Sequence, residues 1–358
     1  MSFQEAINLI DGSDFQAARD ILNKLLEDTR SDAAVKEDVT LNLAVCYAAE
    51  HQLDRAVGLM QELPAHRSNY DLRFNIALCK YQMCKDENVF EFFKELTQLL
   101  DDIIAAGGQV NEVASKVVAE LCNLLWHFKL YQTLETVLLK ARPLFPDKRT
   151  WTRSLAHTLF MMDLRYEECC ELYSELLPDL PEGNDNDNDE EIVADSGILS
   201  ADPFVLANLC VSLVLTGRNT EAEELIKEVE TDESNIGKEN MQVSHLDTIN
   251  LAIGTLYCVK NNQEFGLIRV FKTFELFEEL HRKDCSMKWF HAKRCILALI
   301  DMHCKQMVFV KDDTFDMIIT FLKQCECHGV SVTIDVSGNL AIEARYLRAI
   351  IVRMLHDS

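Results

Sequence analysis

The feature that most constrains this chain is a pair of small residues, twelve positions apart, that recurs along its length. The clearest pairs are Ala6 with Ala18, Ala44 with Ala56, and Gly254 with Gly266. Two antiparallel helices that pack closely need a small side chain on each helix at their crossing, because a large one forces them apart. Large apolar residues surround each pair at helical spacing. The pattern predicts helical hairpins of tetratricopeptide type.

Seven segments of the chain fit this spacing. The first helix carries Ala6, Ala44, Ala77, Cys122, His157, Cys210 or Gly254 at the crossing, and the second carries Ala18, Ala56, Val89, Leu134, Cys169, Ala222 or Gly266. In the third segment the core residues expected after Val89 are Phe93 and Leu96. Successive first-helix residues are 38, 33, 45, 35, 53 and 44 positions apart, whereas the standard repeat has about 34 residues. The longer intervals indicate insertions between helices.

An array of such hairpins accounts for the length and composition of the chain. Each repeat buries its apolar face against its neighbours, so the 358 residues need no single large core. The 12 Gly and 6 Pro are too few for a turn-rich β protein. We therefore expect an all-α, tetratricopeptide-type helical-hairpin superhelix (α-solenoid).

The predicted organisation has four parts. Residues 1–181 form N-terminal repeats, residues 182–200 an acidic disordered loop, residues 201–285 C-terminal repeats, and residues 286–358 a helical cap. The loop is rich in Asp, Glu and Asn and has no aromatic residue, so it cannot bury enough apolar surface to fold. The repeat pattern fails beyond residue 285, where longer amphipathic stretches at about 286–306, 312–327 and 340–356 predict the cap.

Charge and composition exclude several classes of partner. The formal net charge is −24, opposite to the basic face that phosphate binding requires, so we expect no nucleic acid or anionic membrane. The chain has no run of about 18 apolar residues and no signal-peptide pattern at its N-terminus. We therefore expect no membrane insertion. The 13 Cys, an odd number, lie mostly in apolar helical patterns, which indicates buried thiols in a reducing compartment.

Motifs for a metal ion are incomplete. Asp185, Asp187 and Asp189 suggest calcium, but Glu190 and Ser196 stand where an EF-hand loop needs Gly and Glu. The Cys325–His328 block has a single residue between its two thiols, where structural zinc sites have two to four and a second pair elsewhere. We expect no metal site.

Motifs for catalysis are absent from the sequence. The chain has no Gly-rich phosphate loop, no GxSxG turn and no HExxH helix. His157 falls at a predicted crossing, where a packed core histidine is expected. We expect no catalytic residues and no cofactor, and interpret the chain as a binding protein rather than an enzyme.

The concave surface of the superhelix is the expected binding site. The first helices line it, and we expect the positions three before, one after and four after the crossing residue to face it. These positions include Leu41, Val45, Phe74, Leu78, Tyr81, Asn123, Trp126, Ser154, Thr158, Met161, Ala207, Val211, Leu251 and Thr255. The Lys and Asn clamp that grips a C-terminal carboxylate is missing. The apolar and aromatic character of these positions suits an extended segment, for example a Pro-rich one. The alternative is that tight winding buries these residues against one another.

Several blocks in the second half of the chain are more specific than the repeat pattern. They are Leu206–Ser212, Glu221–Leu225, Ile253–Cys258, Phe265–Gly266, Ala292–Cys295, Cys325–Gly329 and Glu343–Arg345. In order and wording they resemble the C-terminal half of the tetratricopeptide repeat protein 30 family, over about 60% of the chain from about residue 145. Residues 1–140 fit the repeat pattern but resemble the family only weakly, and the chain is much shorter than typical members.

The resemblance implies a scaffold subunit of intraflagellar transport complex B, in the cilium or cytoplasm, that supports cilium assembly. Members of the family wind around a Pro-rich segment of intraflagellar transport protein 52 and are linked to tubulin polyglutamylation. Two alternatives stay open. One is a non-ciliary tetratricopeptide adaptor or co-chaperone-like protein, and the other is an enzyme or an activator of glutamylation.

Overall fold

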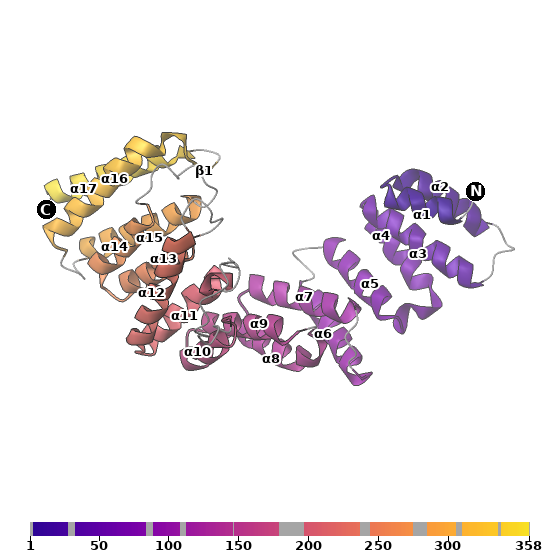
Figure 1. Cartoon of the computed structure of the whole chain (residues 1–358). Helices are drawn as coiled ribbons and strands as arrows, with labels where there is room; N and C mark the ends of the chain where they lie inside the picture. The colour runs from indigo at the N-terminus through magenta and orange to yellow at the C-terminus, as the bar shows by residue number, and fades with distance from the viewer. Residues whose placement is uncertain are drawn as a thin grey trace, which may run out of the picture. The chain divides into compact units, whose positions relative to one another are not determined.

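The structure is a computed structural model that describes residues 3–27, 33–83, 89–107, 112–145, 147–178, 197–236, 244–274, 285–305, 310–335 and 338–357 (Figure 1). In these ranges the chain is helical apart from turns and one short antiparallel strand pair, β1 (Thr333–Asp335) and β2 (Gly338–Asn339). The prediction of an all-α fold built from tetratricopeptide-type hairpins is confirmed. The chain forms two compact units, Met1–Thr158 and Leu159–Ser358. The four-part organisation expected from the sequence stays a prediction.

The first unit is a series of consecutive helical hairpins (Figure 1). It contains α1 (Phe3–Asp11), α2 (Phe15–Glu27), α3 (Ala33–Ala49), α4 (Leu53–Glu62), η1 (Pro64–Arg67), α5 (Tyr70–Met83), α6 (Val89–Ala105), α7 (Glu112–His127), α8 (Tyr131–Ala141) and η2 (Arg142–Leu144). The next helix, α9 (Lys148–Met161), contains the boundary between the two units.

Small residues lie at the helix crossings of the first two hairpins, as predicted. Ala6, Ala18 and Ala56 are completely buried, and Ala44 is 1% exposed. The second helices then bury a large residue four positions on, Leu22 in α2 and Met60 in α4. Each hairpin is therefore held by backbones that approach closely at one point and by large side chains that fill the space beyond it.

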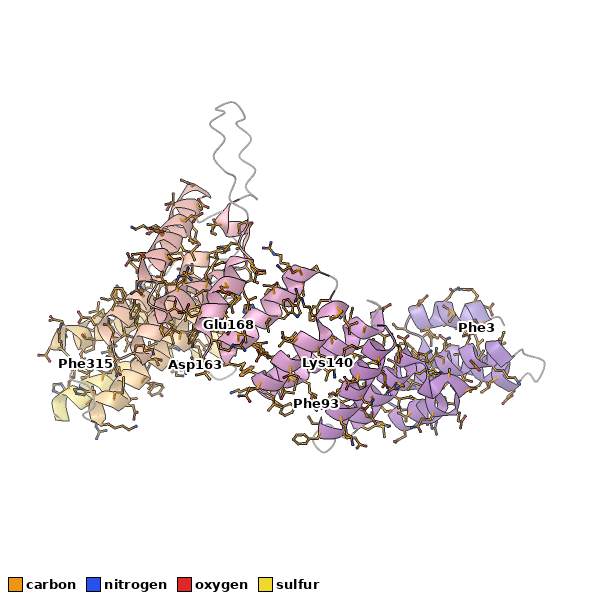
Figure 2. The ribbon with its side chains drawn as sticks, turned by 90° about the horizontal axis from the view of Figure 1, so that it is seen from below. Phe3, Phe93, Lys140, Asp163, Glu168 and Phe315 are labelled. Carbon is orange, nitrogen blue, oxygen red and sulfur yellow. The ribbon has the colours of Figure 1, made fainter. Side chains whose placement is uncertain are left out.

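The third hairpin differs from its predicted register. Val89, the expected crossing residue, is half-buried, whereas Phe92 is 3% exposed. Phe93, which the sequence pattern placed in the core, is also half-buried (Figure 2). Burial in α6 recurs at Phe92, Leu96, Leu99, Leu100 and Ile103, which is the spacing that follows the crossing alanine in α2 and α4. Phe92 thus takes the position of a small residue, and a large aromatic side chain separates α5 from α6.

The turn within each hairpin has a recurring backbone conformation. The residue seven positions after the crossing residue has a positive φ at Ser13, His51, Lys129, Gly217 and Asn261. In the fifth hairpin the residue with positive φ is Asp163, which is seven positions after Ala156. The crossing residue there is Ala156, which is fully buried, and not His157, which is half-buried. The expectation of a core histidine at residue 157 was therefore wrong by one position, because the turn has one extra residue.

The second unit continues with hairpins and ends in longer helices (Figure 1). It contains α10 (Tyr166–Ser174), η3 (Ile198–Ser200), α11 (Pro203–Leu215), α12 (Asn219–Ile236), α13 (His245–Val259), α14 (Gln263–Lys272), α15 (Cys285–Cys304), α16 (Asp312–His328), η6 (Gly329–Ser331) and α17 (Leu340–Asp357), with β1 and β2 between the last two.

The backbones of α13 and α14 approach each other closely where Gly254 and Gly266 meet. A Cβ atom on Gly254 would lie 2.8 Å from the backbone oxygen of Gly266, and one on Gly266 would lie 2.6 Å from the backbone oxygen of Gly254. Atoms at such distances overlap, so only glycine fits at either place. The predicted pairing of residues 254 and 266 is confirmed.

The C-terminal cap consists of α15, α16 and α17. One core cluster joins it to α13 and α14, and the largest fully buried side chains of this cluster include Trp289, Phe274 and Phe315. Figure 2 labels Phe315. Phe321 of α16 stacks on Phe271 of α14 with 3.8 Å between ring centroids. The α16 and α17 helices pack side by side (Figure 1). Small residues remain fully buried in two of these helices, Ala292 in α15 and Ala344 in α17, and large side chains fill much of the remaining core.

The segment predicted as a disordered loop lies mostly outside the described residues, including Asp185, Asp187, Asp189 and Glu190. Its C-terminal end differs from the prediction. Ile198–Ser200 forms η3, which contacts α12, and Ile198 is 2% exposed. These last residues of the predicted loop therefore belong to the folded second unit.

Candidate partner-binding groove

A cleft in the first unit lies between α5 and α6 and reaches the end of α4. Its volume is about 720 Å³. Its lining consists of Gln61, Arg73, Ile76, Ala77, Lys80, Glu91, Lys94, Glu95, Gln98, Leu99 and Asp102. The cleft follows from the third hairpin's sequence, since Phe92 at the crossing prevents the close approach that alanine permits in the first two hairpins.

An aromatic pair lines a smaller pocket that adjoins one end of this cleft. Tyr81 of α5 and Phe92 of α6 stack with 4.5 Å between ring centroids and planes 8° apart. The smaller pocket has a volume of about 100 Å³ and shares Lys80 and Glu95 with the larger cleft. Phe90, nearby in sequence, is 84% exposed. The half-buried ring of Tyr81 can therefore offer aromatic surface at this end to an apolar or proline side chain.

The charges of the cleft are balanced and paired across it. The Lys80 ammonium lies 2.9 Å from a Glu95 carboxylate oxygen, and Arg73 lies 2.7 Å from Asp102. The hydrogen bond from Arg73, with a second one from Gln98, lowers the pKa of Asp102 below its ordinary value. Three basic and three acidic side chains line the cleft. It thus has no preference for a charged partner, and it suits a neutral extended segment that adds hydrogen bonds to the polar rim.

The residues predicted for the groove of this unit on α3, α5 and α7 differ in exposure. Tyr81 lines the smaller pocket and Leu78 is half-buried, whereas Phe74 is only 7% exposed. On α7, Asn123 is exposed and Trp126 is 42% exposed. Trp126 packs edge-on against Tyr131 of α8, with 5.4 Å between ring centroids. On α3, Leu41 is half-buried and Val45 is 44% exposed.

Thr158, at the end of the first unit, is 1% exposed, and its hydroxyl donates to the backbone oxygen of Ser154. In the second unit Met161 is 43% exposed, whereas Ala207, Val211 and Leu251 are buried. Thr255 is half-buried, with its hydroxyl 3.2 Å from Nδ1 of His291 on α15. The prediction that these residues bind a partner stays a prediction, and for the buried ones the contacts are made within the chain.

Sequence reasoning missed the exposed apolar residues of the second unit. Val259 is 69% exposed on α13, Phe290 59% on α15, and Tyr346 69% on α17. In α13 and α15, the positions two before and five after the small crossing residue face away from the core, namely Ala252 and Val259, and Phe290 and Leu297. The neighbouring first helix covers the position three before it, as at Leu251. A helical wheel that included this neighbour would have found the exposed positions.

The Cys325–His328 block does not bring its two thiols together in the part of the chain that the structure describes. Cys325 is fully buried and Cys327 is exposed. Among the residues that the structure describes, no group of three or more His, Cys, Asp or Glu side chains is placed to hold a metal ion. No helix in the described ranges is long and apolar enough to cross a membrane.

The fold defines a helical-repeat protein of tetratricopeptide type. A family model, the intraflagellar transport protein 70 C-terminal domain, matches residues 108–353. The chain belongs to this family, which is the tetratricopeptide repeat protein 30 family under another name. The match begins nearer the N-terminus than the resemblance in the sequence blocks suggested, and so takes in α7 and α8 as well.

Relatives of known name agree with the family. The chain is 34% identical to intraflagellar transport protein 70A of Xenopus laevis over 247 residues, covering 68% of this chain and 35% of that protein. It is 31% identical to intraflagellar transport protein 70A2 of Rattus norvegicus over 270 residues, covering 71% of this chain and 38% of that protein. The matched part thus spans little more than a third of these relatives. Among solved structures, the C-terminal part of a TPR repeat-containing protein from Cytophaga hutchinsonii is similar with 11% identity and a TM-score of 0.48, over 80% of this chain and 99% of that one.

Proposed function

We propose that the protein is a non-enzymatic scaffold or adaptor subunit of an intraflagellar transport complex, complex B, and that it binds an extended partner segment. The observation that carries this proposal is the cleft between α5 and α6, together with the adjoining small pocket that the stacked Tyr81 and Phe92 line. A charge-balanced cleft with an aromatic end suits a segment of low charge that is already extended before it binds. A polyproline helix meets both conditions, since it has no internal hydrogen bonds and costs little to order.

The family supports a particular partner for this cleft. Intraflagellar transport protein 52, through a Pro-rich segment, is the partner we infer, and the cilium and the cytoplasm are the locations we infer. Support for cilium assembly and for tubulin polyglutamylation would follow from holding other proteins in place, with no turnover by this chain. Because the chain spans about a third of its relatives' length, the cleft is proposed as one contact among those of a longer scaffold.

Binding of a Pro-rich peptide from intraflagellar transport protein 52 tests the proposal. Tyr81→Ala removes the aromatic end of the cleft, and Trp126→Ala removes the exposed ring on α7. An aromatic anchor of this kind typically contributes about 2 kcal/mol or more, so each change should weaken binding about thirtyfold. Leu164→Ala is the matched control, since Leu164 is 81% exposed in the turn before α10.

Calorimetry with each folded variant separates the outcomes. Weaker binding by Tyr81→Ala, together with wild-type binding by Leu164→Ala, supports the cleft as the site. Loss through Trp126→Ala alone would move the site to α7 and α8. Wild-type affinity in both aromatic variants would contradict the groove model. Capture of proteins unrelated to cilia by the same chain would favour a non-ciliary adaptor.

A further inference from the structure

Three helices of the second unit run in the same direction side by side. Between α13 and α15, Thr255 contacts His291, and Lys288 forms an ion pair with Asp247. Between α15 and α17, the indole nitrogen of Trp289 donates to Glu343 at 2.7 Å, near the start of both helices. The Cys304 thiol donates to the Met354 sulfur at 3.6 Å, near the end of both helices. The order of these contacts makes α13, α15 and α17 a parallel layer.

One face of this layer is buried and the opposite face is uncovered. Ala292, Ile296 and Leu299 of α15 join Leu347 and Ile351 of α17 in a single core cluster. On the side of each helix turned away from that cluster, large apolar side chains are exposed. They are Met287 (43%), Phe290 (59%) and Leu297 (41%) on α15, and Ile342 (45%), Tyr346 (69%) and Ile350 (49%) on α17. Because both helices turn their buried faces to the same cluster, these six side chains lie on one surface, which we call the α15–α17 face.

The spacing within this face is that of a helix-packing seam. On α15 the exposed residues Met287, Phe290, Arg294 and Leu297 follow one another at intervals of three and four. On α17 Ile342, Tyr346, Ala349 and Arg353 do the same. Alternation of three and four is the pattern by which one helix offers holes to the side chains of another. The face therefore suits a helical occupant lying along α15 and α17.

The charge of these helices differs from that of the rest of the chain. Together α15 and α17 carry six basic residues among Lys and Arg and three acidic ones, in a chain with a net charge of −24. For contrast, α12 carries seven acidic residues and one basic residue. Arg294 is exposed beside Phe290 and forms no ion pair with the residues that the structure describes. Arg345, beside Tyr346, is 70% exposed and reaches Glu326 only at 3.7 Å.

We propose that the α15–α17 face is a docking surface for an acidic amphipathic helix of a partner protein. Its apolar side chains would cover Phe290, Leu297, Tyr346 and Ile350, and its carboxylates would pair with Arg294 and Arg345. Charge complementarity selects this occupant over a second copy of the chain, because two chains of charge −24 repel one another. The surface is in the other unit from the cleft, so the proposal does not rest on the proposed function.

Fluorescence anisotropy with designed peptides tests this proposal on the full chain. The probe is an 18-residue helical peptide with Leu at a and d positions and Glu elsewhere, and the comparison peptide has Lys in place of Glu. We expect the Glu peptide to bind at least tenfold more tightly than the Lys peptide at low salt, with the difference shrinking as salt rises. Phe290→Ala and Tyr346→Ala should each weaken binding of the Glu peptide at least tenfold, and Arg294→Glu should reduce the preference for it.

Matched controls come from the same unit. Phe204→Ala removes an apolar side chain that is 54% exposed on α11, and Lys272→Glu reverses an exposed charge on α14. Both should leave the affinity unchanged. Equal binding of the two peptides, equal effects of control and test variants, or self-association of the chain that Tyr346→Ala abolishes would each overturn the proposal. The last result would assign the face to a second copy.

Discussion

Replacement of Gly266 by Ala gives the sharpest test of how the hairpins are held together. A Cβ atom at residue 266 would lie 2.6 Å from the backbone oxygen of Gly254 and 2.8 Å from the backbone nitrogen of Cys258. Neither is the end of a flexible side chain, so α13 and α14 must separate to accept the new methyl group. The same substitution at Gly58, in the middle of α4, meets no atom within 4 Å.

The two substitutions should therefore change stability in opposite directions. Alanine is favoured over glycine in a helix interior by about 1 kcal/mol. Gly58→Ala should therefore raise the free energy of unfolding by about 1 kcal/mol. Overpacking a tight site costs about 1 to 3 kcal/mol, and contact with two backbone atoms places Gly266→Ala at the upper end. Its net effect should be a destabilisation of about 2 kcal/mol, or roughly a thirtyfold shift of the folding equilibrium.

Urea unfolding followed by circular dichroism measures the free energies, and hydrogen exchange assigns them to the unit affected. For Gly266→Ala, faster exchange is expected in α13 and α14. For Gly58→Ala, slower exchange is expected in α3 and α4. A Gly266→Ala variant as stable as the wild type would refute the reasoning, since alanine would then fit where the two backbones meet.

Three further predictions concern burial and titration. Phe74→Ala should destabilise the first unit by about 3 kcal/mol or more, because Phe74 is 7% exposed and truncation leaves a cavity. Urea unfolding measures this change. A stability equal to that of the wild type would show that the ring lies in solvent. The Arg348 guanidinium, hydrogen-bonded to Glu326, lowers the pKa of that carboxyl below its ordinary value of 4.5. The ion pair's contribution to the free energy of unfolding should be complete above pH 4.5 and lost as the pH falls through the lowered pKa. Glu326→Gln should therefore reduce the loss of stability that urea unfolding measures as the pH is lowered. Desolvation raises the pKa of the half-buried Cys122 thiol to about 11. Iodoacetamide at neutral pH should therefore modify exposed Cys304 and Cys327 well before Cys122, as peptide mass spectrometry would detect. Equally fast labelling of Cys122 would contradict the raised pKa.

The parts of the fold that the sequence predicted correctly are those set by local packing. A small residue at a helix crossing is required whatever the neighbouring hairpins do, so the paired residues at 6 and 18, 44 and 56, and 254 and 266 could be recognised from spacing alone. The twelve-residue rule failed where the turn changed length. One extra residue before α10 moved the crossing from His157 to Ala156, and the different register of α6 brought Phe92 into the crossing in place of Val89.

The candidate site was harder to predict because exposure depends on three helices at once. Phe74 and Leu251 have positions expected of a groove, yet each is buried. A wheel drawn for one helix contains no information on the adjacent first helix, which covers the position three before the crossing. The cleft between α5 and α6 likewise follows from a large residue at a helix crossing. The repeat pattern predicts a small residue there, so the pattern could not predict the cleft.

One packing rule connects the stack of hairpins to the α15–α17 face. Where parallel first helices lie side by side, their small residues and their buried faces are fixed by the hairpin, and only the outward positions are free to vary. The chain places alanine at one such position, Ala252, but phenylalanine at Phe290 and isoleucine at Ile342. Exposed large side chains at these positions contribute nothing to the hairpin's own core. They lie beside Arg294, which forms no ion pair among the residues that the structure describes, in a strongly acidic chain. Such a combination is what contact with another protein requires.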